Sequence, residues 1–312
     1  MIRSFHNIKP VSGGLVALVG LLFALVASAS FYFSNPQAAT GTTYLYIALG
    51  TFSIVLQGLY FNRLCVRYDI VYTHTFIPAL FYVIIGCSNY YFIHCNVNHI
   101  YAWLFLLGLS QIVAIPDSDY PRRNVYSAAI LFGIISLLVP FYIAAVLALF
   151  LFILIFKTPN FLDILAIVSG FALPILLVAS INLIAKTNFN YFLIREINFD
   201  IIPSLPVQSN ILLYPAAIFI FGSLRAAVNY FKNNIQTRRM LRIIVYILLF
   251  HVLIILLNLG SFYKLLLLLI IPLSISFTYL HLGTKRVRLK SVSTILLVVV
   301  FLVHLAWQII EL

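Results

Sequence analysis

Two acidic side chains stand four residues apart in a stretch that is otherwise rich in aromatic and branched residues. Glu196 and Asp200 would share one face if this stretch is helical, and Arg195 lies directly beside them. Paired carboxylates could act as general acid and general base on a substrate. The same charges also suit the solvated face of a helix lying in a membrane interface, with the aromatic and branched residues of the stretch towards the lipid. Both interpretations stay open, with Glu196 and Asp200 as candidate catalytic residues and Arg195 as a candidate substrate contact.

Three further ionisable residues fall inside long apolar segments, where such a group is a functional candidate by default. Arg225 lies about one turn from the end of its segment, so it could contact a phosphate or substrate, or extend to the lipid headgroups. His251 and His304 lie near the middles of theirs. A neutral histidine there can also serve as a hydrogen-bond partner between helices, worth about 1 kcal/mol. These three are candidate substrate-binding residues beside those structural interpretations.

A short polar loop contains His94, Cys95 and His99, which are all possible metal ligands. Zinc sites take three or four ligands, and this loop lacks the usual motif spacing. Asn96 and Asn98 are typical of an ordinary turn. The sequence therefore predicts no metal site, and it predicts no cofactor.

A second polar turn carries Asp117 and Asp119 shortly before Arg122 and Arg123. Together these side chains could bind a cation and a phosphate headgroup. A turn of Pro, Asp and Ser residues that caps a helix has the same composition. Both interpretations are kept.

The composition places most of this chain in lipid. Of its 312 residues 63% are hydrophobic and 8% are charged, with a mean hydropathy of +1.10, whereas a soluble domain is about 25% charged. In lipid every backbone polar group needs an internal partner, which leaves helices or a closed barrel. Runs such as 265–273 and 295–302 are apolar on every face, unlike the alternating strands of a barrel. We therefore predict an all-α fold, a polytopic transmembrane helix bundle in a single integral membrane domain, residues 1–312.

The apolar runs predict about eleven membrane segments, two of them short or re-entrant. The first is expected to be retained as a helix rather than cleaved, because it is long enough to span. Residues 185–210 are expected to form an outer interfacial segment. The predicted segments are residues 14–33, 44–62, 73–92, 100–115, 126–156 (counted as two), 162–184, 211–228, 243–259, 264–281 and 291–310.

The basic residues orient these segments. Fifteen of the nineteen Lys and Arg residues fall on one side if residues 126–156 return the chain to its starting side. The positive-inside rule then places the N-terminus in the cytoplasm and the C-terminus outside. Pro140 could divide 126–156 into two short crossings or a re-entrant hairpin, and the charge pattern does not choose between them.

The net charge of +12 is explained by this orientation, so we expect no nucleic-acid partner. The three cysteines (Cys65, Cys87 and Cys95) form no disulfide framework, and Cys87 and Cys95 are expected to lie too far apart for a bridge. The expected location is a bacterial inner (cytoplasmic) membrane, with the lipid bilayer as the first partner.

Two stretches carry a resemblance: residues 75–90, TFIPALFYVIIGCSNY, and the run from RNVYSAAILFGIISLLVP at 123–140 through KTPNF at 157–161 to GFALP at 170–174. They resemble an uncharacterised multi-pass inner-membrane protein family of Bacteroidota. The short paired helices are also similar to the C-superfamily membrane glycosyltransferases, which use polyprenyl-phosphate sugars. Those enzymes usually carry an acidic residue in the first outer loop. Residues 34–43 contain none, so no catalytic residue is transferred from them.

Three functions follow as hypotheses. The first is a cell-envelope protein that handles a lipid-linked, polyprenyl-phosphate-type substrate, with an architecture like those glycosyltransferases. The second is a non-catalytic membrane subunit or scaffold of an envelope complex, with membrane-protein partners. The third is a transporter. The sequence leaves open whether the chain is an enzyme, because no polar cluster in it specifies a reaction.

Overall fold

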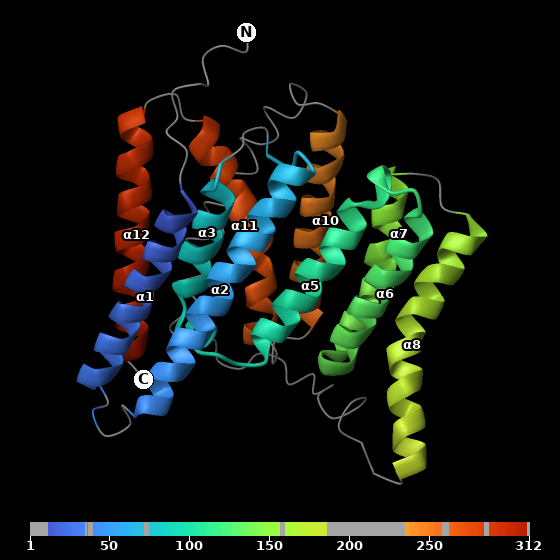
Figure 1. The fold of residues 1–312 in the computed structure, drawn as a ribbon, viewed down its shortest axis with the longest axis horizontal. Helices are drawn as coiled ribbons and strands as arrows, with labels where there is room; N and C mark the ends of the chain where they lie inside the picture. The colour runs from blue at the N-terminus through green and yellow to red at the C-terminus, as the bar shows by residue number, and fades with distance from the viewer. Residues whose placement is uncertain are drawn as a thin grey trace. The chain divides into compact units, whose positions relative to one another are not determined.

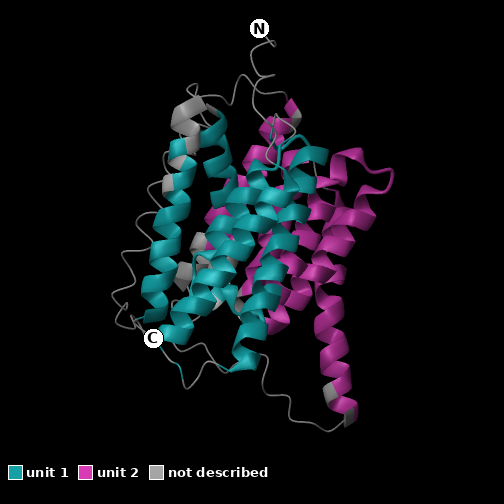
Figure 2. Cartoon of the chain, turned by 60° about the vertical axis from the view of Figure 1, so that its left-hand side comes forward, with its two compact units in different colours: residues 1–99, 215–233, 273–312 teal, residues 100–214, 234–272 magenta. Residues whose placement is uncertain are grey.

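The structure is a computed structural model, and it describes residues 12–34, 36, 40–71, 75–156, 160–185, 235–257, 262–283 and 287–310. Every regular element within those ranges is a helix (Figure 1). The expected all-α fold is therefore confirmed for the described residues. The chain divides into two compact units, coloured separately in Figure 2, and each is built from segments distant in sequence. Unit 1 takes residues 1–99, 215–233 and 273–312, and unit 2 takes residues 100–214 and 234–272.

Unit 1 is built around four packed helices: α1 (Gly13–Ser34), α2 (Gly41–Arg67), α3 (Ile77–Cys87) and α12 (Val287–Ile310). Helix α1 contacts each of the other three, and α2 also packs along α3. Every residue of α3 is buried, as expected of a helix that is apolar all round. The outward face of α1 is also apolar and carries Leu18, Leu21 and Leu25, as expected where lipid is the solvent.

The predicted single helix over 73–92 is wrong. The chain forms α3, then a break, and then the short α4 (Tyr90–Ile93). At the break the Ser88 Oγ donates to the Ile85 carbonyl at 2.7 Å, so it bonds the last turn of α3. Pro78, expected inside this helix, lies in its first turn instead, where a missing N–H costs least.

Unit 2 contains α5 (Asn98–Val113, of which the first two residues belong to unit 1), α6 (Pro121–Leu138), α7 (Ala145–Phe156), α8 (Phe161–Ala185) and α10 (Ile235–Leu257). Short 3-10 turns precede α6 (Ile115–Asp117, η1) and α7 (Pro140–Ala144, η2). The helix α11 (Phe262–Gly283) contributes its first half to unit 2 and its second half to unit 1.

Residues 126–156 form two helices rather than one bent helix. Helix α6 ends at Leu138, and η2 begins at Pro140, whose ring cannot continue the helical hydrogen bonding. The chain then turns back, since the Tyr142 ring lies 6.1 Å from that of Phe132 in the middle of α6. The short paired helices expected around Pro140 are therefore present.

Helices α6 and α8 approach closely through two glycines. A Cβ at Gly170 would lie 2.7 Å from the Tyr126 carbonyl oxygen, and one at Gly133 would lie 2.7 Å from the Phe171 oxygen. Small residues permit such backbone contact between helices in membranes. This contact fixes the first turn of α8 against α6, which positions the polar site described below.

Three of the described helices are long and apolar enough to cross a membrane: α1, α2 and the 161–181 part of α8. Five shorter apolar stretches accompany them, in α3, α5, η2–α7, α11 and α12. The first and seventh predicted segments match α1 and α8 closely. The second, ninth and eleventh are longer than predicted at their charged ends, so that Arg67, Arg242 and Lys290 lie within helices. The eighth predicted segment lies outside the described residues.

Candidate functional site

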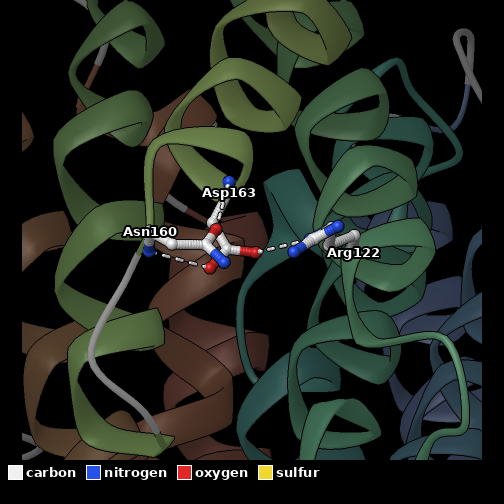
Figure 3. Close-up of polar contacts among 3 residues, drawn as sticks. All are labelled: Arg122, Asn160 and Asp163. Atoms are coloured by element: carbon white, nitrogen blue, oxygen red, sulfur yellow. Dashed lines mark hydrogen bonds and ion pairs between the residues drawn. The ribbon is translucent and has the colours of Figure 1, made fainter.

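The most polar buried contact in unit 2 joins the first turns of α6 and α8 (Figure 3). Arg122 Nε lies 3.7 Å from Asp163 Oδ1, and the Asp163 side chain is fully buried. The Arg122 side chain is 52% exposed, so its guanidinium faces both the carboxylate and the surroundings. A buried carboxylate needs such a partner, because an isolated charge there would be costly.

Asp163 is also held by its own helix start. Its Oδ2 accepts from the Asn160 backbone N–H at 3.1 Å, and its N–H donates to Asn160 Oδ1 at 3.0 Å. This is the reciprocal arrangement of a capping box, which satisfies two donors at the start of α8. The carboxylate is therefore fixed in position, and it fixes Arg122 in turn.

The sequence had placed Arg122 beside Asp117 and Asp119 in a turn, and the structure gives it a different partner. Asp117 and Asp119 are both exposed, and the described ion pair of Arg122 is with Asp163. Sequence reasoning did not single out Asp163. The Asn160–Asp163 spacing before an apolar run was the available signal, because it indicates a capped helix start.

His251, a candidate either for substrate binding or for a hydrogen bond between helices, makes the hydrogen bond. Its Nδ1 lies 2.6 Å from the Ile247 carbonyl, which can only accept, so Nδ1 carries the proton. Its Nε2 therefore accepts from the Tyr142 hydroxyl at 3.0 Å, and Phe105 packs edge-on against the ring at 5.0 Å. The pair joins α10 to η2 within the core of unit 2, and both polar groups are satisfied.

In unit 1 the side chain of Gln57 on α2 makes three hydrogen bonds inside the core. Its Nε2 donates to the His99 carbonyl and to Ser53 Oγ, each at 3.2 Å, and its Oε1 accepts from the Tyr82 hydroxyl at 3.1 Å. Gln57 is fully buried. It links α2, α3 and the start of α5, and sequence reasoning missed it because a single Gln in an apolar run carries no pattern.

The polar loop that holds His94, Cys95 and His99 packs on α2. The Cys95 N–H donates to the Tyr46 carbonyl at 3.0 Å, and His99 Nε2 lies 3.4 Å from the His94 carbonyl. Burial lowers the pKa of His94 from its ordinary value. Within the described residues no group of three or more His, Cys, Asp or Glu side chains could hold a metal ion.

Of the remaining candidate site residues, the structure describes one and leaves four outside the described residues. His304 of α12 is half-buried, and its Nε2 has no hydrogen-bond partner among the described residues. Arg195, Glu196, Asp200 and Arg225 lie outside the described residues, as does the interfacial segment apart from Ala185. The structure therefore does not describe how the catalytic candidates, Glu196 and Asp200, lie relative to one another.

The fold and these sites define an all-α protein whose apolar helices suit a membrane. Scans against protein-family models, curated proteins and solved structures gave no match to this chain.

Proposed function

We propose that this chain is a multi-pass inner-membrane protein of the cell envelope that handles a lipid-linked, polyprenyl-phosphate-type substrate. The observation that carries the proposal is Arg122, which a fully buried carboxylate holds in place while about half of its side chain stays exposed. A guanidinium fork matches phosphate oxygens, and a fork that is already positioned loses less entropy on binding. The short paired helices on either side of Pro140, an arrangement that resembles the C-superfamily membrane glycosyltransferases, support the same class of substrate.

The topology proposed with it has about eleven segments, the N-terminus inside and the C-terminus outside. The count takes residues 126–156 as two segments, and the chain reversal at Pro140 supports this division. The positive-inside rule supports the orientation. Arg122 and the 232–242 cluster then share the cytoplasmic side. Reporter tags in the 232–242 loop and at the C-terminus should report opposite compartments, and a cytoplasmic signal from both would reject this topology.

The test of the headgroup contact compares two neighbouring arginines. Arg122→Ala removes the positioned guanidinium, whereas Arg123→Ala removes an exposed arginine with no ion pair among the described residues. Native mass spectrometry in nanodiscs containing undecaprenyl phosphate should show about a tenfold weaker complex for Arg122→Ala and little change for Arg123→Ala, as expected when a charge-assisted hydrogen bond is lost.

Asp163→Asn sharpens the same experiment, because it keeps a side-chain acceptor for the helix cap and removes the charge that holds Arg122. We expect weaker binding than in the parent, with Arg122→Lys intermediate because lysine keeps the charge without the fork. Equal binding by both alanine variants, or no complex with the parent protein, would reject the proposal. If the protein is an enzyme that uses its carboxylates, Glu196→Ala or Asp200→Ala should abolish turnover; full activity in both would exclude that role.

A non-catalytic membrane subunit or scaffold is the second candidate. It is favoured by the way the buried polar groups pair with one another inside each unit, as His251 does with Tyr142 and Gln57 with Tyr82. Such pairs give helix packing its specificity without requiring a substrate. Gentle solubilisation followed by native mass spectrometry should then reveal a stable membrane-protein partner, and a protein that is alone under those conditions counts against this candidate. The transporter hypothesis stays a prediction.

A further inference from the structure

The segment 94–99 is fastened to the rest of unit 1 at both of its ends. At one end the Cys95 N–H donates to the Tyr46 carbonyl at 3.0 Å. At the other end the His99 carbonyl accepts from Gln57 Nε2 at 3.2 Å. These bonds hold the segment that carries both histidines against α2.

His99 is the more deeply placed of the two histidines, with 4% of its surface exposed. Its Nε2 lies 3.4 Å from the His94 carbonyl, which can only accept, so Nε2 carries the proton. Nδ1 of the same ring then bears a lone pair. It is buried, and it has no hydrogen-bond partner among the described residues.

His94 lies within the same short segment and contacts two tyrosine rings. Its ring centroid is 5.2 Å from that of Tyr46 on α2 and 6.0 Å from that of Tyr90 on α4. The two histidines are five residues apart and joined by the bond from His99 to the His94 carbonyl. They would therefore carry their charges close together if both were protonated.

We propose that the 94–99 segment is an acid-sensitive latch, closed onto α2 while His94 and His99 are neutral and released when they are protonated. Protonation would give His99 a second N–H at Nδ1, a buried atom that has no hydrogen-bond partner among the described residues; the nearby acceptors are the backbone carbonyls of His94 and Phe92, which carry no charge to offset that of the ring. It would also bring a second positive charge from His94 into the same segment. The inference is independent of Arg122, so it stands or falls separately from the proposed substrate.

The surroundings offer little to neutralise these charges. No acidic residue occurs in α1, α2, α3, α4 or α12 of unit 1. The basic residues of α2, Arg63 and Arg67, lie in its final turns, far along the helix from Tyr46. Helix α12 carries Arg288 and Lys290 in its first turn. The other titratable groups carried by the segment and by the elements packed against it are Tyr44, Tyr46, Tyr60, Cys65, Tyr82, Cys87, Tyr90, Tyr91, Cys95, Tyr101 and His304.

The direction of the pH dependence follows from burial. Burial lowers the pKa of His94 from its ordinary value of 6.5, so the closed segment binds protons less readily than the open one. The stabilisation is therefore complete above about pH 6.5 and is lost as the pH falls below that value. The proposed topology places this segment on the outer side, where the pH follows the surroundings.

Hydrogen–deuterium exchange of the full chain in nanodiscs tests the latch, with rates at pH 7.5 and 5.5 corrected for intrinsic exchange. Amides of residues 94–99 should exchange about tenfold faster at pH 5.5 in the parent protein, and the double variant His94→Gln/His99→Gln should lose this difference. His304→Gln is the control and should keep it.

A parent protein whose corrected rates agree at the two pH values would overturn the proposal, as would a double variant that keeps the full difference. If the double variant does not fold, the single variant His94→Gln serves as the test of the latch. It removes one of the two charges without touching the Gln57 and Tyr46 bonds, so an unchanged response would again reject the latch.

Discussion

The two units bury polar side chains in different ways. In unit 1 Gln57 gathers Ser53, Tyr82 and the His99 carbonyl into a network of neutral groups. In unit 2 a charged carboxylate, Asp163, is buried at a helix start against an arginine that is half exposed. A neutral network needs no counter-ion and can lie anywhere in the core. A charged pair costs less desolvation energy where one partner reaches water or headgroups, and such a position suits the binding of an anion.

Two glycines, one in each unit, serve different contacts. In unit 1 the space above Gly50 of α2 is taken by the backbone of the loop at Ile93–Cys95, whereas in unit 2 Gly170 of α8 admits another helix, α6. A loop tied by few bonds can move away from an added methyl group more easily than a whole helix can. The Gly50 loop, however, is also held by the Cys95–Tyr46 bond one turn earlier on α2. Substitutions at the two glycines measure which restraint is stronger.

The largest effect is expected for Gly50→Ala in unit 1. The new Cβ would overlap the Ile93 carbonyl and lie 2.7 Å from the Cys95 nitrogen. We expect a loss of about 3 kcal/mol in unfolding free energy, at the upper end for overpacking. Thermal unfolding in detergent, followed by tryptophan fluorescence, measures it. Gly41→Ala, in the same helix with open space around it, is the control and should leave the midpoint unchanged.

A smaller loss, about 2 kcal/mol, is expected for Gly170→Ala in unit 2. The methyl group would lie 2.7 Å from the Tyr126 oxygen and 2.9 Å from Ala129 Cβ, and α8 could relieve the overlap by a small shift because its other faces are largely exposed. Ser169→Ala changes the neighbouring exposed residue, and its effect should stay within 0.5 kcal/mol. A greater loss at Gly170 than at Gly50 would show that the loop is the more compliant partner.

The smallest effect is expected for Tyr142→Phe, which removes the donor to His251 Nε2 and keeps the aromatic packing around it. Hydrogen bonds between membrane helices average about 0.6 kcal/mol, and a loss of that order should appear in the unfolding midpoint. Tyr120→Phe, at a residue 71% exposed, should have no effect. A loss well above 2 kcal/mol would mean that the pair does more than join two helices.

The sequence predicted α1 and α8 almost to the residue, because each is a long and mainly apolar run with polar residues at both ends. It missed the break at Ser88, since one polar residue inside an apolar run gives no periodic signal and its bond to Ile85 depends on local geometry. The charged ends of α2 and α10 both extend further than predicted, because the helices continue past the membrane boundary that hydropathy detects.

The candidate sites were harder to predict. The interhelical role of His251 followed from its position in an apolar helix, but its partner could not be chosen among nineteen tyrosines without a fold. The pairing of Arg122 with Asp163 spans two helices and depends on the glycine contact between them, which no local pattern contains.

The division of the chain has a consequence for its biosynthesis. Helix α1 is among the first parts of unit 1 to be made, and its partner α12 is among the last. A chain inserted from its N-terminus therefore carries an uncovered face of α1 through most of its translation. Unit 1 can close only after unit 2 has been synthesised, so a ribosome that stalls before residue 287 would leave in the membrane a product that quality-control proteases can recognise.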